Sequence, residues 1–361
     1  MDETETAPTR RGAPTLRDVA RRAQVSVATA SRALTSDYPV AESTRAKVLR
    51  AVQDLNYALP SRPPKRNQAA THVAMVVSDV VSPLRSLVAT GVAEASGDAG
   101  RISSVYITGG DLQREEQVFA RLEEQDDLEA VVLVGGVELT EAYEERMSRH
   151  ARALHTRGAQ LVLCGRPPLP AGVPALVVEY DNRGGAYAAT SHLLSMGHRR
   201  ILTLTGPERS TTTIGRMAGY RSAHEDFGLT IDPALVIPCR ADRSGAYQGC
   251  RQALADGLEF TAIFAHNDVM ASGALAALRE SGLSVPDDIS LVGYDNIPVA
   301  QELSPPLTTV YMPHEEMGKA AVRLALERPE PGSGRERQLL GTHIVIRDSV
   351  RPLPASHHTK R

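Results

Sequence analysis

The spacing of hydrophobic positions along the chain changes near residue 71. Before it, apolar residues recur every three or four positions in three successive segments, which predicts three short helices that each bury one face. The residues expected inside are Leu16, Val19, Ala20 and Ala23, then Ala30, Ala33 and Leu34, then Val48, Leu49, Val52 and Leu55. Two short helices joined by a tight turn and followed by a third are typical of a helix-turn-helix unit.

Polar residues indicate where the first two predicted helices begin. Thr15 precedes the first helix and Asp18 follows three positions later, which is the spacing of a capping box with Asp in place of Glu. Ser26 is placed to cap the second helix. We therefore expect the first helix to start directly after Thr15 and the second directly after Ser26.

The second predicted helix has an outer face suited to DNA. Ser26, Thr29 and Ser31 are small hydroxyl residues near its N-terminus, and Arg32 follows. Small side chains let a helix enter the major groove, hydroxyls suit phosphate oxygens, and Arg suits the O6 and N7 edge of guanine. From this pattern alone, the alternative is a small three-helix domain with an ordinary polar face.

From residue 72 onward, strand-like runs alternate with helical ones. The nine strand-like runs are HVAMVV, ISSVYI, AVVLVG, AQLVLCG, ALVVEY, ILTLTG, TAIFA, DISLVGYD and HIVI. Helical patterns fall at 83–99, 112–125, 140–157, 182–196, 215–227, 244–256, 267–281 and 314–328. This alternation predicts an α/β body of parallel sheets with helices on both faces. Nine strands exceed the roughly five or six of an average sheet, so we expect two doubly wound lobes with a ligand site in the cleft between them.

Charge divides the chain at a similar point. Residues 1–66 carry 12 Lys and Arg against 7 Asp and Glu, although the whole chain of 361 residues has a net charge of −3. A basic N-terminal part on an acidic body is expected of a nucleic-acid-binding head. Because no apolar run resembles a signal peptide or approaches the roughly 20 residues of a membrane span, we expect a cytoplasmic, nucleoid-associated protein.

No motif in the chain indicates catalysis, a metal or a cofactor. The three cysteines, Cys164, Cys239 and Cys250, are too few and too scattered for a zinc site or a disulfide framework. The chain has no G-x-x-x-x-G-K-[ST], G-x-S-x-G or H-E-x-x-H. The remaining rival is a solute-binding transport protein, against which the helix-turn-helix and the lack of a signal peptide argue.

The head has a close resemblance to a known family. The segments TLRDVARRAQVSVATASRAL and VAESTRAKVLRAVQDLNY resemble the head of the LacI/GalR family of bacterial transcription regulators nearly residue for residue. The resemblance implies that Val27 and Ala28 open the recognition helix at base-reading positions and that Arg32 reaches a base. The other DNA-binding positions that it implies are Thr15, Leu16, Ser26, Thr29, Ser31, Thr44 and Tyr57. Ala41 departs from the family, which usually has a capping Ser there.

The body continues the resemblance. GHRRILTLTGP, FAHNDVMASGAL, PDDISLVGYDN and PPLTTV match the family in order and spacing, and imply a periplasmic-binding-protein-like fold. The implied effector contacts are Asp181, Arg216, Asn267 and Asp295, with Ser210 or Thr211 as a further candidate. Carboxylate, amide and guanidinium groups suit the hydroxyls of a sugar or sugar derivative. The alternatives are that Asp268 only caps a helix and that Arg216 belongs to an ordinary surface ion pair.

One cleft segment departs from the family. After the first strand, this chain reads DVVSPLR from Asp79 to Arg85, so that Leu84 and Arg85 replace a pair of aromatics, and His314 stands where a hydrophobic residue is usual. We include Asp79, Leu84, Arg85 and His314 in the expected effector site. Our hypothesis is that Arg85 faces the cleft and selects an anionic effector; the alternative, that Arg85 points to solvent, stays open.

The segment PSRPPKRNQ is the other departure. The resemblance implies a hinge helix that enters the minor groove and inserts a Leu between base pairs, but Arg66 occupies that Leu position, and Pro63 and Pro64 lie inside the expected helix. A proline in a helix interior costs roughly 3 kcal/mol. We therefore expect an extended arm in which Arg62, Lys65 and Arg66 contact the minor groove electrostatically, with little bending of the DNA.

Together these patterns predict a dimeric, effector-controlled DNA-binding regulator, most simply a repressor of a palindromic operator. The expected divisions are a disordered arm (1–14), the DNA-binding domain (15–58), a hinge (59–70), the effector-binding and dimerisation domain (71–350) and a disordered tail (351–361). The chain is expected to cross between the lobes near 180–197 and 310–314. The tail has no leucine heptad, so we expect no tail-driven tetramer.

Overall fold

The computed structural model describes residues 15–34, 41–55, 71–329 and 333–353. The chain divides into two compact units, residues 1–62 and 63–361. We call the described parts of these units the head and the body, and describe each by itself. Among the described residues, no helix is long and apolar enough to cross a membrane.

The head consists of three helices that begin where the polar residues indicate. These helices are α1 (Leu16–Ala23), α2 (Val27–Leu34) and α3 (Glu42–Asp54). The Asp18 carboxylate accepts hydrogen bonds from the Thr15 N–H at 2.9 Å and from the Thr15 hydroxyl at 2.6 Å. The Ser26 Oγ accepts from the Thr29 N–H at 3.0 Å. Both predicted helix starts are therefore confirmed.

The head has a small aliphatic core. Its buried residues are Val19, Ala20, Ala23, Ala30, Ala33, Val48 and Ala51. The prediction for Leu49 is wrong, because this side chain is 45% exposed and Ala51 is buried instead. Positions 48, 51, 52 and 55 lie on one face of a helix, and residue 49 is about 100° away from residue 48. Gln24 has a φ of 56°, a left-handed conformation that ends α1 and makes the tight turn into α2.

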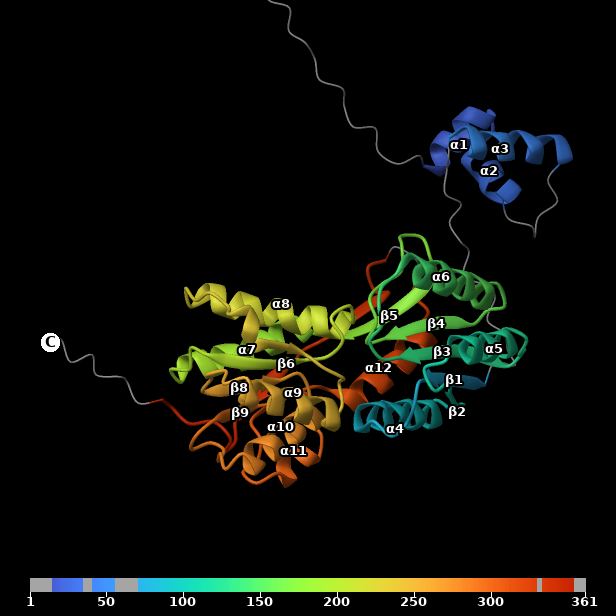
Figure 1. Ribbon diagram of the computed structural model, residues 1–361. Coiled ribbons are helices and arrows are strands. Elements are labelled where there is room, and N and C mark those ends of the chain that lie inside the picture. Colours follow the sequence, from blue (N-terminus) through green and yellow to red (C-terminus); the bar gives the residue numbers. More distant parts are fainter. Residues whose placement is uncertain (1–14, 35–40, 56–70, 330–332, 354–361) are drawn as a thin grey trace, which may run out of the picture. The chain divides into compact units, whose positions relative to one another are not determined.

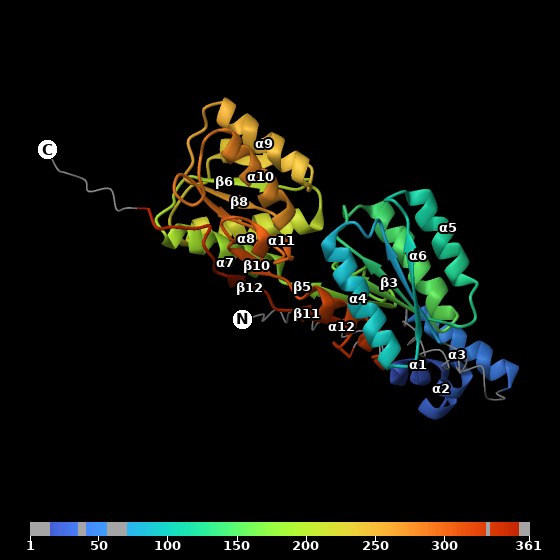
Figure 2. The ribbon, with the colours of Figure 1, turned by 90° about the horizontal axis from the view of Figure 1, so that it is seen from below.

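The first lobe of the body is a six-stranded parallel sheet between two pairs of helices (Figures 1 and 2). In sheet order its strands are β11 (Arg337–Leu340), β5 (Ala175–Tyr180), β4 (Gln160–Cys164), β3 (Leu128–Val134), β1 (His72–Val77) and β2 (Ile102–Ile107). Figure 2 shows α4 (Pro83–Asp98) and α12 (His314–Glu327) on one face, and α5 (Leu112–Glu123) and α6 (Glu141–Thr156) on the other.

The second lobe is a four-stranded parallel sheet with the same layering. Its strands in sheet order are β7 (Val236–Pro238), β6 (Ile201–Thr205), β8 (Ala262–Ala265) and β9 (Ser290–Val292). Helices α7 (Asn182–Ser195) and α8 (Thr211–Asp226) pack on one face, and α9 (Arg243–Ala255) and α10 (Asp268–Glu280) on the other (Figure 2). A 3-10 turn (Pro233–Leu235) and the short α11 (Val299–Glu302) complete the lobe. The predicted two-lobed α/β architecture is therefore confirmed.

The chain crosses between the lobes at three places in the described residues. It passes from β5 into α7, from β10 (Thr309–Tyr311) into α12, and from β11 into β12 (His343–Val345), which pairs antiparallel with β10. The sequence indicated only the first two. It missed the third because β11 is short and half exposed and has no clear hydrophobic pattern, and the three-residue β10 was also missed. β7 was missed for the same reason.

The predicted disordered tail begins too early. The Leu353 N–H donates to the Met196 carbonyl at 2.8 Å, and the Arg351 N–H donates to the Ser290 Oγ at 3.1 Å. Residues 351–353 are therefore part of the second lobe. The arm at 1–14, the hinge at 59–70 and the rest of the tail lie outside the described residues.

Candidate DNA-binding surface and ligand cleft

The outer face of α2 is open along its length. Val27 is 43% exposed, and Ala28, Ser31 and Arg32 are also exposed, while Ala30 and Ala33 pack into the core of the head. Because α2 starts with a β-branched and two small residues, its N-terminal turn presents backbone and methyl groups without long side chains. This face has the dimensions and chemistry that a helix needs to enter the major groove.

The other expected DNA contacts are placed less uniformly. Thr15 is exposed at the N-terminus of α1, and Thr44 lies half-buried in the first turn of α3. Leu16 packs against the core of the head, so only part of it is open to solvent. Ser26 and Thr29 bond each other through their hydroxyls at 2.8 Å. Tyr57, Arg62, Lys65 and Arg66 lie outside the described residues, and so do Pro63 and Pro64.

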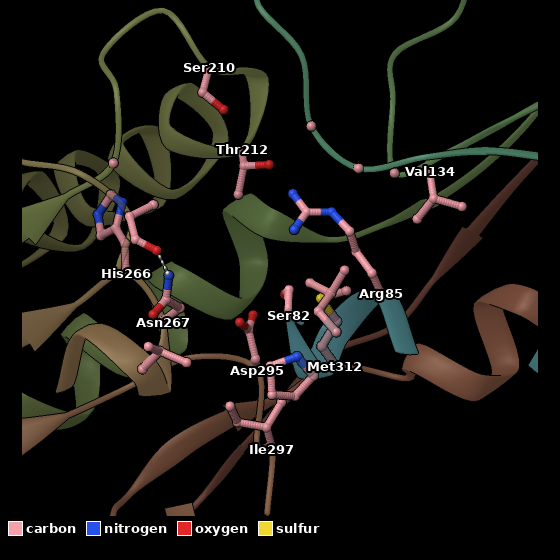
Figure 3. A pocket seen from close by; sticks show the side chains of 18 of the residues that line it. Ser82, Arg85, Val134, Ser210, Thr212, His266, Asn267, Asp295, Ile297 and Met312 are labelled. Carbon is pink, nitrogen blue, oxygen red and sulfur yellow. Dashed lines mark hydrogen bonds between the residues drawn. The ribbon is translucent and has the colours of Figure 1, made fainter. Parts of the chain in front are cut away.

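A cavity of about 590 Å³ lies between the two lobes of the body. Residues from both sheets line it at the carboxyl ends of strands, among them Asp79 and Gly135 from the first lobe and Pro207, Asn267 and Asp295 from the second. This is the edge at which open α/β sheets bind ligands. Figure 3 shows Arg85 and Val134 facing Ser210, Thr212 and Asn267 across the cavity.

Arg216 is a fixed part of the second-lobe wall. Its side chain is 3% exposed and donates to Asp295 Oδ1 at 3.0 Å, to Asn182 Oδ1 at 3.0 Å and to the His266 carbonyl. The guanidinium also lies over the Tyr294 ring, 3.6 Å from its centroid. Asp295 has a φ of 104°, a backbone conformation that only a well-supported non-glycine residue adopts. Arg216 is therefore not a surface ion-pair residue.

Arg85 forms the corresponding pair on the first-lobe wall. Its Nη1 lies 2.8 Å from Asp79 Oδ2, and Arg85 lines the cavity and does not point to solvent alone. Burial by itself would raise the pKa of Asp79, but hydrogen bonds from the Ser82 N–H and the Arg85 charge together hold it below its usual range. Of the two alternatives for Arg85, the cavity-facing one agrees with the structure.

Some of the predicted effector residues line this cavity and others do not. Asp79, Leu84, Arg85, Ser210, Arg216, Asn267 and Asp295 line it. Asn267 also caps α10, because its Oδ1 accepts from the Met270 N–H at 2.7 Å. Asp181 caps α7 through the Gly184 N–H at 2.7 Å and lines a smaller cavity of about 300 Å³. His314 is buried beneath the site, with its Nε2 3.0 Å from the Asp295 carbonyl oxygen.

Two buried groups beside the cleft, His266 and Asp268, were not among the expected effector residues, and Asp268 is not the helix cap either, because Asn267 caps α10. His266 lines the cavity, and within the described residues neither of its ring nitrogens has a hydrogen-bond partner. Burial, and then the Arg216 charge, lower its pKa to about 3, so the ring is neutral. Asp268 accepts from the Thr309 hydroxyl at 2.5 Å and from the Ile297 N–H at 2.9 Å. Burial and the Asp295 charge raise its pKa to about 8.

A third omission, Thr212, could have been found from the sequence. It stands two positions after Ser210 in the first turn of α8, and both residues line the cavity. The predicted helix began at residue 215, four residues late, because the run Thr211, Thr212 and Thr213 is poor in helix-forming residues. Among the described residues, no group of His, Cys, Asp or Glu is arranged to hold a metal ion.

Comparisons with known proteins agree with this geometry. Residues 15–60 match the model of the bacterial regulatory proteins of the lacI family, and residues 190–350 match that of the periplasmic binding protein-like domain. The chain is 32% identical over 343 residues to the HTH-type transcriptional repressor PurR of Photobacterium profundum, covering 94% of this chain and 99% of that one.

Two further similarities cover nearly the whole chain. The HTH-type transcriptional repressor CytR of Escherichia coli (strain K12) is 31% identical over 352 residues, which is 95% of this chain and 98% of CytR. The solved complex of the transcriptional regulator CelR with cellobiose has a TM-score of 0.67 and 31% identity, over 93% of this chain and 99% of that chain. All three similar proteins are transcriptional regulators and not enzymes.

Proposed function

Because this chain belongs to the lacI family of bacterial regulatory proteins, we propose that it is a cytoplasmic repressor that binds a palindromic operator as a homodimer. An effector in the cleft between the lobes then changes its affinity for DNA. The observation that carries the proposal is the open face of α2, where Val27, Ala28 and Arg32 are exposed in the order needed to read base edges. In the thermodynamic cycle, DNA must change effector affinity by the same factor as the effector changes DNA affinity.

The charges around the cleft favour an uncharged effector. Arg85 is paired with Asp79 at 2.8 Å and Arg216 with Asp295 at 3.0 Å, so the charges of these four groups sum to zero. The effector screen described below distinguishes this proposal from the hypothesis that Arg85 selects an anionic effector. The CelR structure contains cellobiose, a neutral sugar. We propose a neutral sugar or similar polyol, which the paired groups would contact through their remaining donors and acceptors.

The edge strand β2 supports the proposal of a dimer. Ile102 is 71% exposed, Val105 45% and Ile107 53%, and β2 pairs only with β1 in the described part of the sheet. An exposed apolar edge strand is a place where chains associate unless it is covered. We propose that a second copy of this chain covers it. A helix-turn-helix pair held in this way would read two half-sites about one helical turn apart.

The unusual hinge sequence supports a basic arm without a wedge. In the family pattern the position of Arg66 carries a Leu, and Pro63 and Pro64 precede it. We propose that Arg62, Lys65 and Arg66 contact the minor groove without kinking the DNA. A gel-based bending assay tests this directly: Arg66→Leu should increase the bend, and a strong kink with the unmodified protein would contradict the proposal.

The main test is DNA binding with an effector screen. Operator DNA is first selected from a random pool, and its affinity is then measured with and without neutral sugars and their phosphorylated or acidic analogues. We expect Arg32→Ala to weaken specific binding by about 1–3 kcal/mol. Thr140→Ala, in the first lobe at the N-cap of α6, serves as the control. A solute-binding protein, the alternative function, would bind sugars but show only weak, salt-sensitive DNA binding.

A further inference from the structure

The two lobes touch each other directly at one side of the cleft. The first lobe contributes residues 136–138, from the loop after β3, and the second contributes residues 209–212, at the start of α8. We call these two segments together the latch. Figure 3 shows Ser210 and Thr212 of the latch on one side of the cavity, and Ile297 and Met312, close to the β10 crossover, on the opposite side. The latch therefore joins the lobes on the side of the cavity away from the β10 crossover, whereas its Thr211 lines the smaller cavity together with Tyr180 and Asn182 of the β5 crossover.

Hydrogen bonds run in both directions across the latch, one between backbone groups and one from a backbone N–H to a side-chain hydroxyl. The Thr211 N–H donates to the Val137 carbonyl at 2.9 Å, and the Val137 N–H donates to the Thr211 Oγ1 at 3.2 Å. Glu138 and Ser210 form an antiparallel bridge beside them. Every one of these bonds begins and ends on the protein, so the latch is complete without any ligand atom.

Gly136 provides the space that the latch needs. A Cβ added at this position would lie 2.4 Å from the Thr212 Oγ1 and 3.4 Å from the Thr212 Cβ. The backbone of Gly136 is outside the left-handed region, so an alanine is compatible with its conformation. The reason for glycine here is therefore the close approach of the opposite lobe and not a turn of the chain.

An ion pair adds little to the latch. Arg209 Nε lies 2.8 Å from Glu138 Oε1, but the two side chains are 74% and 49% exposed. Exposed pairs of this kind contribute little and are screened by salt. The hydrogen bonds between Val137 and Thr211 and the fit of Gly136 against Thr212 are the contacts that hold the lobes together at this side.

We propose that the latch holds the cleft closed in the unliganded protein, through contacts between the two lobes alone. A bound effector then adds its own contacts to a closed state that the latch already favours. Lobe closure is then an equilibrium of the unliganded protein, and the latch sets its position. A stronger latch raises the fraction of closed protein, and a weaker one reduces apparent effector affinity by the same fraction.

Amide hydrogen exchange at single-residue resolution, measured on the full-length protein without effector or DNA, tests the proposal. We expect the Val137 and Thr211 amides to be protected in the unmodified protein. Gly136→Ala should push the lobes apart and speed their exchange roughly tenfold, which corresponds to the loss of one or two hydrogen bonds. Adding Thr212→Ala removes the atom that the new methyl group meets, and should restore the protection.

Two further variants complete the design. Thr211→Val removes only the hydroxyl acceptor, so the Val137 amide should exchange faster while the Thr211 amide, which still donates to a backbone carbonyl, changes less. Gly97→Ala, on α4, is the matched control, because a Cβ there has no neighbour within 4 Å in the described residues. It should leave both latch amides unchanged.

Each outcome decides the question. Unprotected Val137 and Thr211 amides in the unmodified protein would overturn the proposal, as would Gly136→Ala without effect or a double variant that stays unprotected. If Gly136→Ala fails to fold, the Thr211→Val pattern still decides. The proposal rests on the proposed function only in treating the cleft as the effector site. Since the exchange measurement needs neither effector nor DNA, its failure would leave the DNA-binding proposal intact.

Discussion

The two walls of the cleft each carry an arginine paired with an aspartate, and the pairs differ in their burial. On the second lobe, Arg216 and Asp295 are 3% and 9% exposed. On the first lobe, Arg85 and Asp79 are 28% and 42% exposed, although their contact of 2.8 Å is as short. The same kind of ion pair is therefore buried in the second lobe and partly open to solvent in the first.

This difference determines what each wall can do. Removing one partner of a buried ion pair leaves an uncompensated charge and typically costs about 3–5 kcal/mol, whereas an exposed pair is worth roughly 0–1 kcal/mol. The second-lobe wall is consequently a fixed template whose groups keep one arrangement. The first-lobe pair lies closer to solvent and can separate at little cost, so Arg85 is less firmly fixed than Arg216.

The largest expected effect is that of breaking the buried pair. Arg216→Ala should lower the free energy of unfolding by about 3–5 kcal/mol, because it leaves Asp295 buried without its partner. Urea denaturation of the full-length protein measures this, with circular dichroism as the signal. A loss below about 1 kcal/mol would mean that the two walls are energetically alike.

The second prediction concerns pH, and again the buried wall. Asp268 has its pKa raised from 3.8 to about 8 by burial and by the Asp295 charge. Between these values the folded protein holds a proton that the unfolded chain releases, so this group makes stability fall as pH rises, by at most about 1.4 kcal/mol per pH unit. Asp268→Asn should remove this contribution. Denaturation of both proteins at acid and mildly alkaline pH checks it; parallel pH profiles would contradict it.

A third prediction uses the unpartnered imidazole. His266→Phe removes two buried nitrogens that have no partner among the described residues, so stability should stay the same or rise by about 1 kcal/mol. The matched control is His72→Phe. Its ring nitrogens lie 3.0 Å from Gln125 Oε1 and 2.6 Å from Ser104 Oγ, so this change should destabilise the protein. Equal losses at the two positions would show that His266 is satisfied in solution.

The smallest effect is expected from the exposed pair. Arg85→Ala should lower the free energy of unfolding by less than about 1 kcal/mol. Added salt should make the difference between the variant and the unmodified protein smaller still, because solvent already screens the pair. Thermal unfolding at low and high salt measures both effects. A salt-independent loss of stability as large as that of Arg216→Ala would mean that the Arg85 pair behaves like a buried one. The two walls would then not differ.

The sequence was most successful at predicting features that depend on local periodicity, namely where helices start and which of their faces point outward. The outward positions of α2 and the starts of α1 and α2 follow from helical spacing and capping residues alone. The cleft was predictable in outline, because Asn267 and Asp295 come at the ends of buried strands whose carboxyl edges face the same cavity. Leu49 shows the limit of this method, since a hydrophobic residue in an amphipathic helix is not always on its buried side.

What was missed depends on contacts between distant segments. The raised pKa of Asp268 follows from burial and from the charge of Asp295, 27 positions away, which outweigh the hydrogen bonds from Thr309 and Ile297; these groups meet only in the folded lobe. Asp181 occupies the position that the family pattern indicated, but its carboxylate is engaged with the start of α7. Single-sequence spacing carries no information on which of two nearby cavities a side chain enters.

The three crossovers between the lobes limit how the body can move. Two rigid bodies joined by one flexible segment can rotate about several axes, whereas three segments side by side leave essentially one, the axis that runs through them. Here β5, β10 and β12 lie at that junction, and the last two are hydrogen-bonded to each other. The two lobes are therefore joined at one junction made of three chain segments, which favours opening and closing about that junction over other relative motions of the lobes.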